Sequence, residues 1–179
     1  MSNSITGKIL TLYGDNVSTD DMIAGKYIGT DIPEELAKWC MHDLDPDFPA
    51  RMAPGGFVVG RNNFGCGSSR EHAAIALKAC NVKAIIAEEY GRIFYRNCIN
   101  IGLLLLECKG IAEKVALNDE LEIDFDSGVI KNLTKGEEYQ GQPMPEFLLE
   151  KVNAGGLMPE LKKWSDEQWA SGKWDKYKK

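Results

Sequence analysis

The feature that most constrains this chain is a glycine- and serine-rich turn between two regular segments. Residues 56–60 (GFVVG) form a short apolar run, and residues 65–70 (GCGSSR) form the turn. Residues 71–80 that follow are rich in alanine and contain neither glycine nor proline. Apolar, β-branched runs are typical of buried strands, whereas alanine-rich runs favour helices. The sequence therefore predicts a strand, a tight turn and a helix, with the turn opening the helix.

The composition of the turn suits the binding of an anion. Backbone N–H groups at a helix start lack intrahelical partners and lie at the positive end of the helix dipole, so carboxylates and phosphates bind well there. Gly65 and Gly67 permit unusual φ angles and close approach of a ligand. Arg70 can hold a planar carboxylate through two parallel hydrogen bonds. We therefore expect a carboxylate or phosphate site at this turn.

A simpler interpretation assigns the turn to helix capping alone. Ser68 or Ser69 is then the N-cap, and Glu71 completes a capping box. This interpretation explains one serine and the glutamate, but it leaves both glycines, the second serine and Arg70 without a role.

Two other uses of such a turn fit less well. A dinucleotide site would place a third glycine where the helix packs closely, and Arg70 stands at that position instead. A hydrolase nucleophile elbow needs glycine two residues before and two residues after its serine, and neither Ser68 nor Ser69 has both. Cys66 could be a reactive thiol near a helix start, although a small residue tolerated in a tight turn is the simpler interpretation.

Composition predicts one globular domain that does not bind nucleic acid or membrane surfaces in general. The chain has 179 residues, of which 44% are hydrophobic and 27% charged, and its net charge is −6. This length suffices for a single hydrophobic core. The negative charge argues against general binding to nucleic acid or to a membrane surface.

The cysteines indicate reduced thiols rather than a metal site. No CxxC pair and no paired histidine spacing accompany them, so the sequence predicts no metal or cluster bound by this chain. An odd number of cysteines without an export signal, together with the absence of a long apolar run, predicts a cytoplasmic protein outside the membrane. The five cysteines are at positions 40, 66, 80, 98 and 108.

Alternation of strand-like and helix-like segments predicts an α/β core with some parallel pairing. A hairpin follows it, because apolar residues alternate with acids over 121–125 and a Ser-Gly turn precedes 129–130. A loop is expected over 43–54. The tail 162–179 contains three tryptophans that do not share one helix face, so we expect a surface helix or, alternatively, a docking tail. The expected strands are 8–13, 56–60, 82–87 and 103–106, and the expected helices are 33–42, 71–80, 92–100 and 145–153.

A second cluster of polar residues, 18–21 (STDD), follows the first strand. The simpler interpretation is another helix cap or Asx turn. The functional interpretation makes Asp20 the partner of a cation or of a catalytic histidine.

Three segments together resemble a known family. Residues 63–72 (NFGCGSSREH), 84–87 (AIIA) and 92–97 (RIFYRN) are similar to the small subunits of 3-isopropylmalate dehydratases in the aconitase superfamily. The resemblance covers most of residues 7–161 and does not extend to the tail.

The resemblance implies a single swivelling β/β/α domain over residues 1–179, with a mixed sheet like that of the aconitase C-terminal domain. Such a domain closes over a separate large subunit, which carries an iron–sulfur (4Fe-4S) cluster, so that no cofactor is bound by the small subunit. The implied enzyme is a cytoplasmic hydro-lyase of leucine biosynthesis, which moves a hydroxyl group between adjacent carbons by dehydration and rehydration.

The resemblance also assigns roles to residues. Ser68 matches the general base that removes a proton from the carbon beside a carboxylate. Ser69 and Arg70 match binders of the substrate carboxylate, and the amide groups of Gly67 and Ser69 add to the positive field. Asp20 matches the acid that supports a catalytic histidine on the large subunit.

One loop departs from the family pattern. Tyr27-Ile28-Gly29 stands where several members have Tyr-Leu-Arg, whose arginine is linked to substrate choice. We expect Lys26, or the open space at Gly29, to alter the pocket for the variable group of the substrate. The leading substrate is 3-isopropylmalate; the alternatives are a homoaconitase or methylated-malate dehydratase subunit, and a non-catalytic anion-binding regulatory module.

Overall fold

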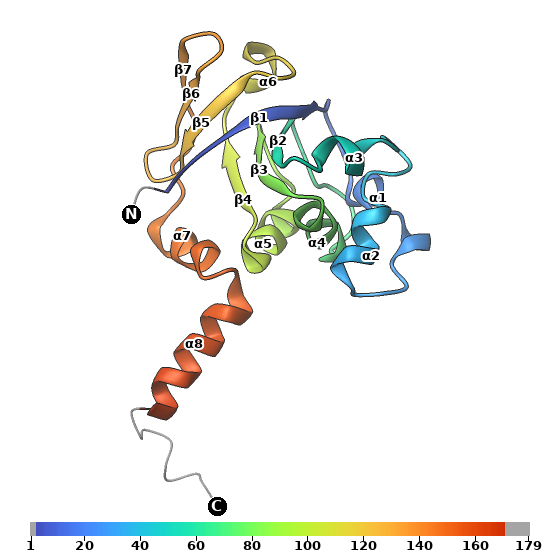
Figure 1. The fold of residues 1–179 in the computed structure, drawn as a ribbon, viewed down its shortest axis with the longest axis vertical. Coiled ribbons are helices and arrows are strands. Elements are labelled where there is room, and N and C mark those ends of the chain that lie inside the picture. The colour runs from blue at the N-terminus through green and yellow to red at the C-terminus, as the bar shows by residue number, and fades with distance from the viewer. Residues whose placement is uncertain (1–2, 171–179) are drawn as a thin grey trace, which may run out of the picture.

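The fold is built on one mixed sheet, and the computed structural model describes residues 3–170 of the chain. The sheet has seven strands, with the parallel strands on one side of β1 and the antiparallel strands on the other (Figure 1). In spatial order the strands are β4 (Leu104–Glu107), β3 (Val82–Ala87), β2 (Gly56–Gly60), β1 (Ser4–Leu12), β5 (Glu120–Asp124), β6 (Val129–Asn132) and β7 (Glu137–Gln140).

Strand β1 joins the two halves of this sheet. Its first half pairs antiparallel with β5, from Ser4 opposite Asp124 to Lys8 opposite Glu120. Its second half pairs parallel with β2, and the register shifts between Ile9 and Thr11. The expected α/β architecture with a mixed sheet is therefore confirmed.

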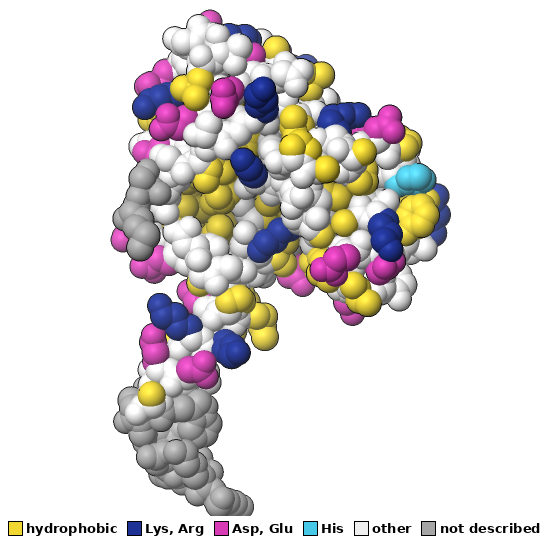
Figure 2. Space-filling view, in the orientation of Figure 1, with side chains coloured by type: hydrophobic (Ala, Val, Ile, Leu, Met, Phe, Trp, Pro, Cys, Tyr) yellow, Lys and Arg dark blue, Asp and Glu magenta, His cyan; other side chains and the backbone are white. Residues whose placement is uncertain are grey.

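The helices gather mainly around the parallel strands, and α8 extends away from the rest of the structure (Figure 1). Within the described residues, none of them is both long and apolar enough to cross a membrane. Basic and acidic side chains are interspersed over the coloured part of the face in Figure 2. The helices are α1 (Thr19–Met22), the 3-10 helix η1 (Gly25–Tyr27), α2 (Pro33–Lys38), α3 (Phe48–Met52), α4 (His72–Ala79), α5 (Arg92–Ile101), α6 (Ile111–Lys114), α7 (Glu146–Asn153) and α8 (Leu157–Ala170).

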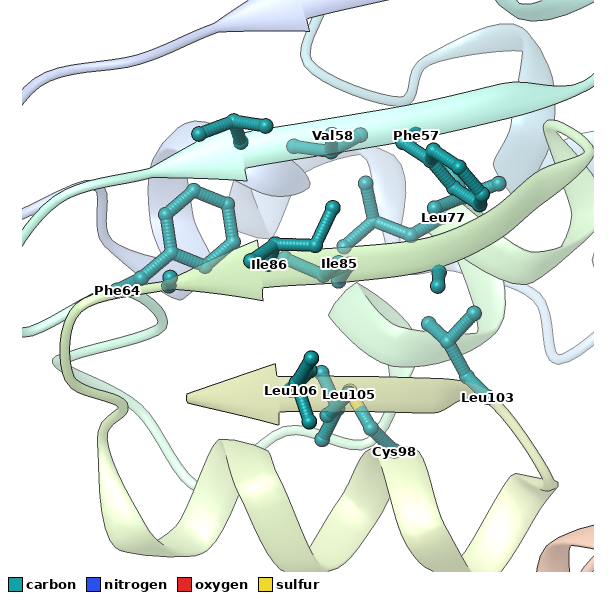
Figure 3. Packing of buried hydrophobic residues seen from close by; sticks show 14 of the residues in the cluster. Phe57, Val58, Phe64, Leu77, Ile85, Ile86, Cys98, Leu103, Leu105 and Leu106 are labelled. Carbon is teal, nitrogen blue, oxygen red and sulfur yellow. The ribbon is translucent and has the colours of Figure 1, made fainter. Parts of the chain in front are cut away.

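The main core lies between the parallel strands and their helices. Figure 3 shows side chains of β2, β3 and β4 packed with Leu77 of α4 and Cys98 of α5. All five residues of β2 are buried, and so are the last four of β3. Strands covered on both faces lose the polar and apolar alternation of half-exposed strands. This is why β2 and the last four residues of β3 appear in the sequence as continuous apolar runs.

Some expected elements differ from the structure. The stretch 43–54, expected as a loop, contains α3, because Pro49 lies in the first turn and the side chains of Phe48 and Met52, one turn apart, are both buried. Helix α2 ends at Lys38 rather than near position 42. Strand β7 was not expected from the sequence, because its four residues include two glutamates and bury only Tyr139.

Helix α8 includes residues 162–170 of the tail, and residues 171–179 lie outside the described part of the chain. Met158, Leu161 and Trp164 are exposed on α8. The side chain of Trp169 and all of Trp174 lie outside the described part of the chain.

Candidate functional site

The glycine-rich turn lies at the carboxyl ends of β1 and β2. Backbone hydrogen bonds fix it against the segment that follows β1: the Gly65 N–H donates to Val17 O at 2.7 Å, and the Thr19 N–H donates to Cys66 O at 2.8 Å. On its other side, the Gly91 N–H donates to Phe64 O at 2.8 Å. The turn therefore continues the sheet between the segments that follow β1 and β3, and it is held from both sides.

Both glycines of the turn have the positive φ angles expected from the sequence. Gly65 has φ +81°, and a Cβ atom added there would lie 2.2 Å from Phe94 Cδ1. Gly67 has φ +95°. Residues with a Cβ atom rarely adopt this region, so the backbone path of the turn depends on glycine at both positions.

Thr19, for which the sequence predicts no role, holds the backbone of Ser68. Its side chain is buried, with 1% exposure. Its hydroxyl accepts a hydrogen bond from the Ser68 N–H at 2.9 Å and donates one to Ser68 O at 3.2 Å. The hydroxyl and acid cluster at 18–21 signalled this residue, but its partner lies 49 positions along the chain.

The capping interpretation of Ser68 and Ser69 is wrong. Helix α4 begins at His72, its N-cap is Glu71, and no side chain caps it. The half-buried Ser68 side chain instead accepts a 3.4 Å hydrogen bond from the Arg70 N–H. The helix starts after Arg70, and Ser68 lies in the open turn, where Thr19 holds its backbone.

Capping does account for part of the 18–21 cluster. Ser18 caps α1, since its hydroxyl accepts from the Asp21 N–H at 3.1 Å. The Asp21 carboxylate accepts in return from the Ser18 N–H at 2.8 Å. The simpler interpretation therefore holds for Ser18 and Asp21, and Asp20 is not used for capping.

Asp20 forms an ion pair with Arg70. Arg70 Nη1 lies 2.7 Å from Asp20 Oδ1, and the two side chains are 33% and 58% exposed. The expectation that Asp20 faces a cation is therefore met within this chain, and the ion pair limits the freedom of the guanidinium group.

Asn97 supports the turn from α5. Its Nδ2 donates to Ser69 O at 3.1 Å. The family-like segment RIFYRN contains this asparagine, but no role for it followed from the sequence. Ser69 itself is exposed, so its side chain is open to a ligand.

The loop that precedes α2 reaches the site through Gly25. A Cβ atom at Gly25 would lie 3.5 Å from Arg70 Nη1. The Lys26 ammonium pairs with Asp43 at 2.9 Å rather than with the turn, and this hydrogen bond raises the pKa of Lys26 and lowers that of Asp43. Around Gly29 the space is open, with no heavy atom within 4 Å of an added Cβ.

Tertiary structure thus brings together Asp20, Gly67, Ser68, Ser69 and Arg70. The set combines two hydroxyl groups, a carboxylate, a guanidinium group and a turn rich in backbone amides. Such a set can hold a carboxylate and place a hydroxyl oxygen in a positive field.

The described residues do not suit an iron–sulfur cluster. Residues 3–170 contain no group of three His, Cys, Asp or Glu side chains placed to hold a metal ion. The five cysteines are free, and four of them are buried. The donor atoms of this chain therefore do not form a cluster site within its described part.

Comparisons with known proteins agree with this arrangement. The model of the aconitase C-terminal domain matches residues 44–110. The isopropylmalate/citramalate isomerase small subunit of Methanocaldococcus jannaschii is 53% identical over 91% of this chain and 96% of its own length. The 3-isopropylmalate dehydratase small subunit of Ruminiclostridium cellulolyticum is 52% identical over 87% and 95%.

A further relative and a solved structure extend the comparison. The 2,3-dimethylmalate dehydratase small subunit of Eubacterium barkeri is 51% identical over 82% of this chain and 90% of its own length. The crystal structure of 3-isopropylmalate dehydratase (leuD) from M. jannaschii superposes with a TM-score of 0.87 at 40% identity, and covers 94% of this chain and 99% of that one. The chain therefore belongs to the family of 3-isopropylmalate dehydratase small subunits, in the aconitase superfamily.

Proposed function

We propose that this chain is the small subunit of a heteromeric hydro-lyase that isomerises a 2-hydroxy dicarboxylic acid by dehydration and rehydration. The leading substrate is 3-isopropylmalate, which places the enzyme in leucine biosynthesis and in the cytoplasm. The observation that carries the proposal is the meeting of Ser68, Arg70 and Asp20 at one turn, although Asp20 is 50 residues from Arg70 in sequence.

Ser68 is the proposed general base. An isolated serine alkoxide is a poor base near neutral pH, so its oxygen needs preorganised donors. The Arg70 N–H already points to Ser68 Oγ at 3.4 Å, and Thr19 fixes the Ser68 backbone. Helix α4 starts four residues later, so its dipole contributes less than the adjacent amides and the Arg70 guanidinium.

Arg70 is the proposed carboxylate binder, together with Ser69 and the Gly67 amide. Asp20 engages Nη1 of the guanidinium. Other N–H groups on the guanidinium can form a fork to a substrate carboxylate. We further propose that Asp20 supports a histidine of the large subunit once the domain has closed over it.

We assign the 4Fe-4S cluster to the large subunit. The support is that residues 3–170 offer no set of ligands for it. When bound there, the cluster supplies Lewis-acid activation of the substrate hydroxyl group. The chain alone is then inactive, and the large subunit is its obligate partner.

Overall identity does not select the substrate. The relative named for isopropylmalate and citramalate is 53% identical to this chain, and the relative named for 2,3-dimethylmalate is 51% identical. We propose that Lys26 and the open space at Gly29 set the preference among these acids. A methylated malate or homoaconitate is the alternative substrate, and a regulatory anion-binding module is the alternative from another class.

The first test is anaerobic reconstitution with the candidate large subunit from the same source, followed by an absorbance assay over unsaturated di- and tricarboxylic acids. Hydration of one acid fixes both the reaction and the substrate. Ser68→Ala should abolish turnover and keep the affinity for the large subunit, whereas unchanged turnover would remove Ser68 as the base. A cluster-loaded complex that hydrates none of the acids would favour the regulatory module.

The specificity loop is tested by Gly29→Arg. An added side chain meets no heavy atom within 4 Å, so the melting temperature should stay unchanged while the ratio of kcat/KM between isopropylmalate and a smaller methylated malate shifts. Gly14→Arg is the matched control, since Gly14 has equally open surroundings and lies outside the loop. An unchanged ratio in Gly29→Arg would exclude Gly29 from substrate choice.

A further inference from the structure

A cavity lies apart from the turn. It has a volume of about 380 Å³, within the range of small-molecule sites. It lies between the N-terminal half of α5, the end of β4 and residues 142–148. None of the residues assigned above to catalysis or substrate binding lines it.

Two arginines on one face of α5 carry positive charge into this cavity. Arg92 and Arg96 are one turn apart and both line it. Within residues 3–170 neither side chain has a hydrogen-bond or ion-pair partner. The first turn of α5 contains no acidic residue and has no side-chain cap. Two like charges near the positive end of a helix are unfavourable, and a bound carboxylate would relieve that repulsion.

A negative charge lies in the same cavity. Glu107, at the end of β4, lines it, and its side chain likewise has no partner within the described residues. Burial, with the Glu107 charge nearby, raises the pKa of Tyr95. Tyr95 therefore keeps its O–H as a hydrogen-bond donor at neutral pH.

The remaining wall is apolar. Leu105, Pro143, Met144 and Leu148 line it, and Leu105 and Met144 are buried. A ligand that complements all of these groups carries a carboxylate that pairs with the arginines, an ammonium group that pairs with Glu107, and an apolar side chain that packs against this wall. We propose that the cavity binds a free α-amino acid with an aliphatic side chain.

The cavity is connected to the turn by direct contacts. The Tyr95 and Tyr90 rings lie 5.7 Å apart, and the Tyr90 and Phe64 rings 6.4 Å apart, measured between centroids. Phe64 immediately precedes Gly65 of the turn. Asn97, next to Arg96 on α5, hydrogen-bonds Ser69. A ligand bound against α5 is therefore in contact, through these residues, with the backbone that carries Ser68 and Arg70.

The test is calorimetric titration of the full chain with L-leucine. Two matched probes are 4-methylpentanoate, which lacks the amine, and 3-methylbutylamine, which lacks the carboxylate. L-leucine should bind, and each probe should bind at least about tenfold more weakly, as expected when a charge-assisted hydrogen bond is lost. Because the readout is binding to this chain, its outcome does not depend on the proposed hydro-lyase activity.

Variants locate the site. Arg96→Gln and Glu107→Gln should each weaken L-leucine binding by about tenfold or more, and Lys163→Gln, an exposed change on α8, should leave it unchanged. Circular dichroism melting confirms that each variant is folded. Failure of L-leucine to bind, equal binding of 4-methylpentanoate, or full binding by both cavity variants would overturn the proposal.

Discussion

Replacing Thr19 by valine tests whether the Thr19 hydroxyl positions Ser68. Valine has nearly the same shape, but it removes the hydrogen bond from the Ser68 N–H and the one to Ser68 O. A net hydrogen bond contributes about 0.5–1.5 kcal/mol. Because Ser68 is only half-buried, water can partly replace the lost partners. We expect the free energy of unfolding to fall by about 1–3 kcal/mol, or roughly 2–4 °C of melting temperature per kcal/mol.

The effect on catalysis should be larger than the effect on stability. A misplacement of about 1 Å can cost about 100-fold in rate, so kcat of the reconstituted enzyme should fall between about tenfold and 100-fold. Affinity for the large subunit should stay unchanged, because Thr19 is buried. The measurements are calorimetric melting of the chain and steady-state kinetics of the complex.

Thr19→Ser is the matched control. It keeps the hydroxyl and loses one buried methyl group, so it should cost about 0.5–1.5 kcal/mol of stability, like other single-methyl deletions. Its kcat should remain close to that of the parent. If Thr19→Val keeps full kcat while its stability falls, the threonine is only structural and the positioning argument is refuted.

Two further substitutions test the turn and the antiparallel half of the sheet. Gly65→Ala should lower the free energy of unfolding by about 2–5 kcal/mol, the sum of the cost of a left-handed backbone and of an overpacked contact with Phe94. Gly110→Ala, at φ +69° in open space, should lose only the part due to the backbone. Equal losses of stability in the two variants, measured by denaturant unfolding, would contradict the steric argument. Although burial alone would raise the pKa of Asp119, hydrogen bonds from Asn132 and neighbouring groups hold it below its usual value. The stabilisation of the fold by ionised Asp119 is therefore complete above the unfolded pKa of about 3.9 and is lost as pH falls through the lower folded pKa. In Asp119→Asn, the free energy of unfolding, measured with urea at several pH values, should depend less on acid pH. An unchanged pH dependence would count against this role of Asp119.

Local signals in the sequence were sufficient to predict most of the helices and strands and the position of the turn. The apolar run at 82–87 matches β3, and the helix expected at 92–100 matches α5 to within one residue. The positive φ angles of Gly65 and Gly67 were expected because only glycine adopts them at little cost. The sequence missed α3 and β7, which have few buried residues and no long apolar period.

The sequence by itself predicted a glycine-rich turn suited to an anion, with Arg70 as its charged group, and the resemblance to the family added the proposed role of Ser68. Only the tertiary structure decided what supports them. Parallel pairing of β1 with β2 places the carboxyl ends of both strands side by side, and this brings Thr19 to Ser68 and Asp20 to Arg70. Contacts between residues about 50 positions apart leave no periodic signal in a sequence, because they depend on the register of the sheet rather than on local propensity.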